Sequence, residues 1–146
     1  MIKKIVFIFL FSCLQHVFGQ TKADTVQIKQ AALDYIEGFY NSDWQRMTKA
    51  IHPELVKRII VVTDSGDEML KTIGASELIF STKKHKNAAD ESKIPFAATV
   101  AILDMNSNIA TIKITTNKLQ FFDYAHLGKI GGEWKIINVL WAKKEN

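Results

Sequence analysis

The apolar positions in residues 21–51 follow the spacing of helices. Over Thr21–Asn41 they recur every three or four residues, which predicts an amphipathic helix that begins with Asp24 as its cap. A second, short helix is expected over Trp44–Ile51. Pro53 ends it, because the residue before a proline avoids the helical conformation. The buried stripe of the first helix is predicted to contain Ile28, Ala32, Tyr35, Ile36 and Phe39.

Further along the chain the pattern changes to that of strands. Lys57–Thr63 and Glu68–Ile73 flank a turn and predict a hairpin, and a third short helix is expected to begin near Gly74. The C-terminal half predicts a meander of four strands, two of them long enough to require a strongly curved antiparallel sheet. The four ranges are Phe96–Asp104, Ile109–Thr116, Leu119–Ile130 and Glu133–Lys143.

The last two strands carry large apolar groups on both faces. Strict alternation places Asp123 on one face of its strand and Tyr124 and His126 on the other, and it places Asn138 beside Trp134. A sheet face exposed to water would be more polar. One face is therefore expected to pack under the helices and the other to contact a second copy of the chain, which predicts a homodimer through the sheet.

The first nineteen residues have the form of a cleavable export signal. Lys3 and Lys4 precede a short apolar run, which is too short to span a bilayer, and Gly19 supplies a small residue at the expected cut. Residues 1–19 are thus predicted to be a signal peptide and residues 20–146 a single domain that is periplasmic or extracellular. The alternative is lipoprotein anchoring at Cys13, whose surroundings loosely resemble a lipidation site.

Removal of this signal changes what the composition implies. The full chain of 146 residues has 19 basic and 15 acidic residues and a net charge of +4, and loss of Lys3 and Lys4 leaves +2. We therefore expect no nucleic-acid partner, and the cluster Lys83–Lys86 is interpreted as a solvated surface. Cys13 is the only cysteine, so the mature domain has no disulfide.

Five segments of the sequence resemble one known family. They are Asp34–Tyr40 with Asp43, His52–Leu55, Asn108–Ala110, Phe122–Leu127 and Trp134–Asn138. Together they resemble the family labelled "putative lumazine-binding", within the NTF2-like (SnoaL-like) superfamily. The resemblance implies a cone-shaped α+β fold, in which N-terminal helices pack on a curved sheet and enclose an apolar cavity. Ala125 departs from the larger apolar residue common in such sequences, which would widen the cavity. Relatives use the cavity in different ways, so the fold does not fix the function.

The candidate catalytic residues are Asp123 and His126. A buried carboxylate or imidazole with a shifted pKa can act as a general base. The two residues are three apart on a strand, so they cannot form a dyad unless a bulge intervenes. The sequence leaves open which of them faces the cavity. For Asp123, a purely structural acid bonded to the backbone or to a tyrosine is the alternative.

The candidate ligand-binding residues include aromatic and polar groups from several elements. Tyr35 needs a hydrogen-bond partner if buried, and we expect it to meet Asp123 across the cavity. His52 is predicted to cap the second helix or to cover the cavity. No metal site is expected, because the histidines lack ligand spacing, and no cofactor is predicted. The complete set is Tyr35, His52, Asp123, Tyr124, His126, Trp134 and Asn138.

Three functions remain open at this point. The leading hypothesis is an exported domain that binds a small apolar or heteroaromatic ligand in its cavity without catalysis. The second is an isomerase or hydratase that uses Asp123 or His126 as general base. The third is a protein-interaction module with a filled core.

Overall fold

A computed structural model describes residues 22–86 and 94–144 of the chain. The predicted signal peptide and Cys13 lie outside the described residues. Within these two ranges, no helix is long and apolar enough to cross a membrane.

The helices precede most of the sheet, as expected. The first helix is described over residues 22–40, and its apolar stripe is buried. Helix α2 (Trp44–Ala50) begins at Asp43, whose side chain accepts a hydrogen bond from the backbone N–H of Arg46. This contact satisfies one of the free N–H groups of the first turn. Helix α3 (Ala75–Lys84) follows the first hairpin and ends in two lysines, which the helix dipole favours there.

Gly38 allows the first helix and α2 to approach closely. A Cβ atom at this position would lie 3.1 Å from the backbone N of Met47 and 3.2 Å from the carbonyl oxygen of Asp43. Both neighbours are backbone atoms, which cannot rotate away. The turn between the helices therefore depends on the missing side chain of Gly38.

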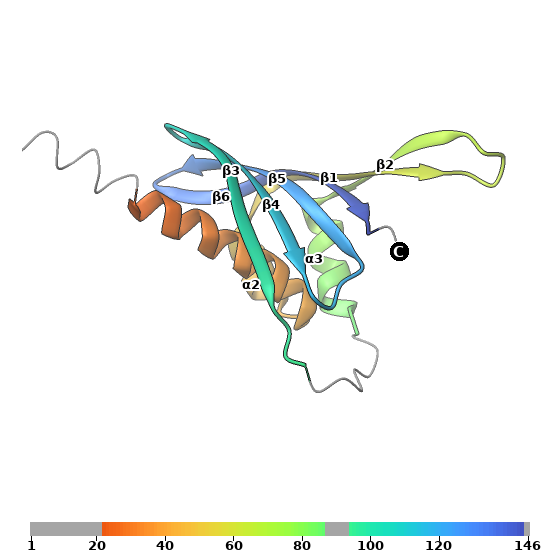
Figure 1. The fold of residues 1–146 in the computed structure, drawn as a ribbon, viewed down its shortest axis with the longest axis horizontal. Helices are drawn as coiled ribbons and strands as arrows, with labels where there is room; N and C mark the ends of the chain where they lie inside the picture. Colours follow the sequence, from red (N-terminus) through yellow and green to blue (C-terminus); the bar gives the residue numbers. More distant parts are fainter. Residues whose placement is uncertain (1–21, 87–93, 145–146) are drawn as a thin grey trace, which may run out of the picture.

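The described residues form one sheet of six strands in the order β2-β1-β6-β5-β4-β3 (Figure 1). All neighbouring strands are antiparallel except β1 and β6, so the sheet is mixed rather than wholly antiparallel. Ile51 at the start of β1 pairs with Ile136 near the start of β6, and the two strands therefore run in the same direction. The strands are β1 (Ile51–Val62), β2 (Glu68–Gly74), β3 (Ala98–Asn106), β4 (Ile109–Thr116), β5 (Phe121–Ile130) and β6 (Glu133–Lys143).

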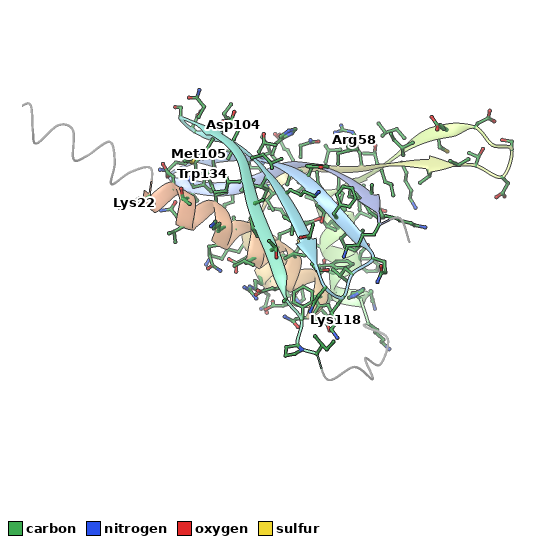
Figure 2. All side chains as sticks on the ribbon, viewed as in Figure 1. Lys22, Arg58, Asp104, Met105, Lys118 and Trp134 are labelled. Atoms are coloured by element: carbon green, nitrogen blue, oxygen red, sulfur yellow. The ribbon has the colours of Figure 1, made fainter. Side chains whose placement is uncertain are left out.

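The helices cover one face of the sheet and leave the opposite face, here called the outer face, uncovered by any described element (Figure 1). The core lies between the helices and the inner face and is built from aliphatic residues of β4, β5 and β6 packed on the first helix. The β1–β2 hairpin extends beyond the helices, and β2 is mostly exposed. Figure 2 shows Trp134 near Lys22 at the start of the first helix.

Candidate functional site

Three polar side chains meet inside the otherwise apolar core. Tyr35 comes from the first helix, Lys57 from β1 and Asp123 from β5. The Nζ atom of Lys57 lies 2.6 Å from Oδ1 of Asp123 and donates a hydrogen bond of 2.6 Å to the hydroxyl of Tyr35. The Tyr35 hydroxyl donates in turn to Oδ2 of Asp123 at 3.5 Å. We call Tyr35, Lys57 and Asp123 the polar triad.

Burial controls the electrostatics of the triad. Asp123 is completely buried, Tyr35 is 2% exposed and Lys57 is 7% exposed. Loss of water raises the pKa of Asp123, although the Lys57 ammonium partly opposes this effect. Burial likewise lowers the pKa of Lys57, with Asp123 opposing, and it raises the pKa of the Tyr35 hydroxyl well above its usual value. The hydrogen bonds of each ion to the other and to Tyr35 offset part of the cost of removing both charges from water.

Three aromatic rings surround the ammonium group of Lys57. Its Nζ atom lies 5.3 Å from the ring centre of Tyr35, 5.2 Å from that of Phe121 and 5.1 Å from that of Trp141. At these distances a ring attracts a cation that lies over its face, as at Phe121 and Trp141, whereas Nζ meets Tyr35 at the hydroxyl end of its ring. The rings thus replace part of the hydration that the ammonium loses.

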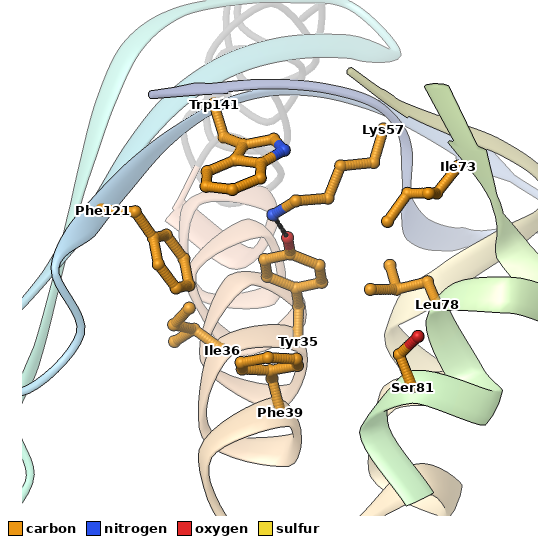
Figure 3. A pocket seen from close by; sticks show the side chains of 9 residues that line it. All are labelled: Tyr35, Ile36, Phe39, Lys57, Ile73, Leu78, Ser81, Phe121 and Trp141. Atoms are coloured by element: carbon orange, nitrogen blue, oxygen red, sulfur yellow. Dashed lines mark hydrogen bonds between the residues drawn. The ribbon is translucent and has the colours of Figure 1, made fainter. Parts of the chain in front are cut away.

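A cavity of about 220 Å³ opens beside the triad (Figure 3). Its wall is almost entirely apolar, and Lys57 and the Tyr35 hydroxyl supply its innermost polar groups. Ser81 on α3 is the one exposed residue among those that line it, which places the mouth of the cavity at α3. The lining consists of Tyr35, Ile36, Phe39, Lys57, Ile73, Leu78, Ser81, Phe121 and Trp141.

Lys57 has a hydrogen-bond donor left for a bound molecule. An ammonium group has three N–H donors. Among the described residues, two acceptors lie within hydrogen-bond distance of Nζ, the Tyr35 hydroxyl and the Asp123 carboxylate. Because Lys57 also lines the cavity, its third N–H is available to an acceptor atom of a ligand there. Asp123 itself is not among the lining residues, since Lys57 and Tyr35 separate it from the cavity.

The structure places Asp123 and His126 on opposite faces of β5, as the alternation predicts. Asp123 faces the helices, whereas His126 is exposed on the outer face. A contact between Tyr35 and Asp123 was also expected. The two side chains are hydrogen-bonded directly, and Lys57 donates a hydrogen bond to each of them. Two of the predicted ligand-binding residues, Tyr35 and Asp123, thus belong to the triad.

Tyr124, His126 and Asn138 lie on the outer face, away from the cavity. The amide of Asn138 lies 3.0 Å from Nδ1 of His126, and its oxygen accepts a 2.8 Å hydrogen bond from the guanidinium of Arg58. The expectation that Asn138 shares a face with Trp134 is wrong. A bulge between His126 and Leu127 leaves one extra residue, Ile137, in β6, and this reverses the alternation after it.

His52 and Trp134 also lie outside the cavity. Helix α2 ends at Ala50, so His52 does not cap it; it belongs to β1, where its Nδ1 accepts a 3.2 Å hydrogen bond from the backbone N–H of Glu54. Trp134 is buried and donates from Nε1 to Asp24 at 2.9 Å. Asp24 lies within the first helix rather than at a cap, and it also bonds Lys129 at 2.6 Å. Trp134 therefore anchors that helix to the sheet.

Lys57 is the member of the polar triad that is absent from the residues expected from the sequence. The signal was present, because Leu55, Lys57 and Ile59 alternate on one face of β1 and all three are buried. A lysine between two inward aliphatic residues is a sign of a buried charge with a partner.

No group of three or more potential metal ligands occurs among the residues that the structure describes.

Several solved structures share the fold of this chain. An NTF2-like protein of unknown function from Shewanella baltica OS155 aligns with a TM-score of 0.66 and 19% identity, covering 85% of this chain and 96% of that one. A second NTF2-like protein of unknown function, from Silicibacter pomeroyi DSS-3, aligns with a TM-score of 0.62 and 13% identity, covering 85% and 98%. Among curated proteins, none matches the chain.

A ketosteroid isomerase-like protein from Erwinia carotovora atroseptica SCRI1043 also shares the fold, with a TM-score of 0.56 and 13% identity over 83% of this chain and 96% of that one. At such identities the likeness concerns the fold alone, and it confirms the predicted NTF2-like α+β architecture. A family model described as "Putative lumazine-binding" matches residues 23–142. The chain therefore belongs to this family.

Proposed function

We propose that this protein binds a small planar heteroaromatic molecule in the cavity beside the polar triad, without transforming it. The observation that carries the proposal is an apolar, aromatic-lined cavity with one hydrogen-bond donor, on Lys57, at its inner end. Ligand pockets commonly combine an apolar wall with a few polar groups that fix orientation. The family description points to the same class of ligand.

The volume of the cavity limits the size of the ligand. A volume of about 220 Å³ is below the range of roughly 300–1,000 Å³ that holds drug-sized molecules. One ring or two fused rings fit this space better than the three-ring system of a flavin. The ring must carry a carbonyl oxygen or a ring nitrogen as acceptor for Lys57, because a ligand without one would leave that N–H buried and unpaired.

Binding without catalysis is favoured over acid–base catalysis by the positions of the two candidate bases. Asp123 is separated from the cavity by Lys57 and Tyr35 and is already paired with an ammonium group. His126 is on the outer face. A general base must come within hydrogen-bond reach of the proton that it removes, and neither residue meets this requirement for a molecule in the cavity.

The experiment is a titration of residues 20–146 with lumazine. Isothermal titration calorimetry measures the binding, and the shift in melting temperature is the second readout. Ser81→Trp should abolish binding, because a large ring at the mouth fills the cavity. Ser76→Trp is the matched control, since Ser76 is exposed on the same helix but does not line the cavity. Equal binding by both variants would refute this site, and no binding of any one- or two-ring heteroaromatic to the wild type would refute the ligand class.

The outer face of the sheet supports a homodimer as part of this proposal. Tyr124, Leu140 and Ile60 are 38%, 45% and 60% exposed on it, and Leu103 on β3 is 52% exposed. The pairing register places Tyr124 next to Leu140, and Leu140 next to Arg58 of β1. Water would contact these apolar groups in a single chain, and a second copy packed on the same face would cover them.

We also propose that the domain works outside the cytoplasm after removal of residues 1–19. The charged start and the short apolar run of the chain support this step. Expression of the full chain in a bacterium, followed by N-terminal sequencing of the exported fraction, tests it. A new N-terminus at Gln20 is expected. A lipid-modified Cys13 would instead establish membrane anchoring, and an intact Met1 in the cytoplasm would rule out export.

A further inference from the structure

The amino group of Lys57 stands in an unusual chemical setting. It lies 2.6 Å from a carboxylate and 2.6 Å from a phenol, at the wall of an apolar cavity (Figure 3). An amine with a proton acceptor and a proton donor beside it, shielded from water, has what is needed to react with a carbonyl group. A lysine that served only to pair with Asp123 would not need to line the cavity.

We propose that Lys57 captures an aromatic aldehyde or ketone in the cavity as a reversible imine. This inference rests on the proposed function, because the carbonyl compound must first enter the same cavity. It specifies the class of ligand, which is a ring that carries a reactive carbonyl group. It also adds a covalent mode of retention.

The polar triad can move every proton that the reaction requires. Lys57 first transfers a proton to Asp123, and its free electron pair then attacks the carbonyl carbon. The carbonyl oxygen takes up the proton that Asp123 holds, relayed through the Tyr35 hydroxyl, so that Asp123 is a carboxylate again. The oxygen gains a second proton from the former amine as the carbon–oxygen bond breaks, and water leaves. The net change is one ammonium and one carbonyl compound giving one protonated imine and one water, with no change in charge or oxidation state.

The protonated imine suits the site as well as the ammonium does. It retains one positive charge, so Asp123 keeps its counter-ion and no buried carboxylate is left unpaired. The rings of Phe121 and Trp141 remain beside the cation. The apolar wall limits the access of water, which would reverse the reaction.

Burial also makes the amino group of Lys57 more reactive than that of a solvated lysine. A solvated lysine, with a pKa near 10.4, is almost fully protonated at neutral pH and therefore reacts slowly. Loss of water lowers the pKa of Lys57, which raises the fraction of free amine. Lys113 offers a comparison, because its Nζ also lies near an aromatic ring, 5.0 Å from that of Phe122, but on the outer face of the sheet and away from the cavity.

The test uses benzaldehyde as the probe and sodium borohydride to reduce any imine to a stable amine at neutral pH. Intact-mass measurement followed by peptide mapping of the wild type is expected to find one benzyl group per chain, on Lys57. Lys57→Arg keeps the positive charge but forms no imine, and it should lose the label, whereas Lys113→Arg should keep it. The wild-type map decides by itself if Lys57→Arg does not fold.

The result that overturns the proposal is an unmodified Lys57 while benzyl alcohol, the non-reactive analogue, still binds in the cavity by ligand-observed NMR. In that case the proposed binding function stands and the imine does not. Label spread over exposed lysines without preference for Lys57 has the same meaning. If neither benzyl alcohol nor lumazine binds, the proposed function fails, and the imine proposal fails with it.

Discussion

Lys57 and Asp123 form an ion pair across a strand that lies between them. They belong to β1 and β5, and β6 separates these strands in the sheet. Two strand spacings amount to roughly 9–10 Å, yet Nζ and Oδ1 are 2.6 Å apart. Lys57 is in register with Val139 of β6 and Asp123 with Trp141, so the pair crosses β6 diagonally. The long side chain of lysine makes this reach possible, so the pair ties three strands together beneath the first helix.

The first prediction concerns the cost of breaking this pair. Lys57→Met leaves a buried carboxylate without its cation, and Asp123→Leu leaves a buried ammonium; each should lower the free energy of unfolding by about 3–5 kcal/mol. The triple variant that combines both changes with Tyr35→Phe removes all three polar groups and should lie within about 2 kcal/mol of the wild type. Urea denaturation measures all four proteins. Additive losses in the triple variant would show that the pair is not a coupled unit.

The second prediction tests the close contact at Gly38. Gly38→Ala should destabilise the domain by about 1–3 kcal/mol, because the new methyl group meets the backbone of Met47 and Asp43. Gly74→Ala is the control, since a Cβ there has no neighbour within 4 Å and the residue lacks a positive φ. Thermal unfolding should therefore distinguish the two variants. Similar melting temperatures would contradict the packing described between the first helix and α2.

The third prediction is a dependence on pH that originates at Asp24. Hydrogen bonds from Lys129 and Trp134 lower the pKa of Asp24 in the folded protein. A carboxyl whose folded pKa lies below its unfolded value stabilises the fold fully above the unfolded pKa, near 3.9, and loses this effect as the pH falls through the folded pKa. Asp24→Asn should thus be less stable by about 1 kcal/mol near pH 6. The difference should shrink below about pH 4. A constant difference from pH 6 to pH 2.5 would disprove this origin.

The fourth prediction concerns the outer face. Leu140→Glu should convert the proposed homodimer to a monomer, because it places a charge among the exposed apolar groups of the outer face. Phe80→Glu is the control, since Phe80 on α3 is 62% exposed and lies on the helical side. Light scattering after size-exclusion chromatography measures the mass of each protein. A monomeric wild type at micromolar concentration would reject the dimer outright.

Regular alternation made most of the sheet predictable from the sequence. Residues of β4 alternate between buried and less buried positions without a break, and the expected range Ile109–Thr116 is the observed one. The same reasoning placed Asp123 and His126 on opposite faces. It failed for Asn138, because the bulge at Ile137 is a property of strand pairing and leaves no mark on the local pattern.

The site was harder to predict than the fold. Asp123 and Tyr35 could be proposed because each is a polar residue on an apolar stripe. Lys57 stands first in the strand predicted over Lys57–Thr63, and its partner is 66 positions away on a strand that is not adjacent. His52 was misplaced since α2 ends at Ala50 and the chain enters β1 before Pro53. Contacts between distant segments decided both cases: the alternation of Leu55, Lys57 and Ile59 indicates a buried lysine, but a single sequence does not identify its partner.

The most direct test of the ligand cavity is a set of intermolecular NOEs between bound lumazine and the methyl groups of the protein. Ile36, Ile73 and Leu78 line the cavity, whereas Ile60 and Leu140 are exposed on the outer face. The account predicts NOEs from the ligand ring to the first three residues and none to the other two. NOEs to the outer face alone, or none at all at saturating ligand, would contradict it.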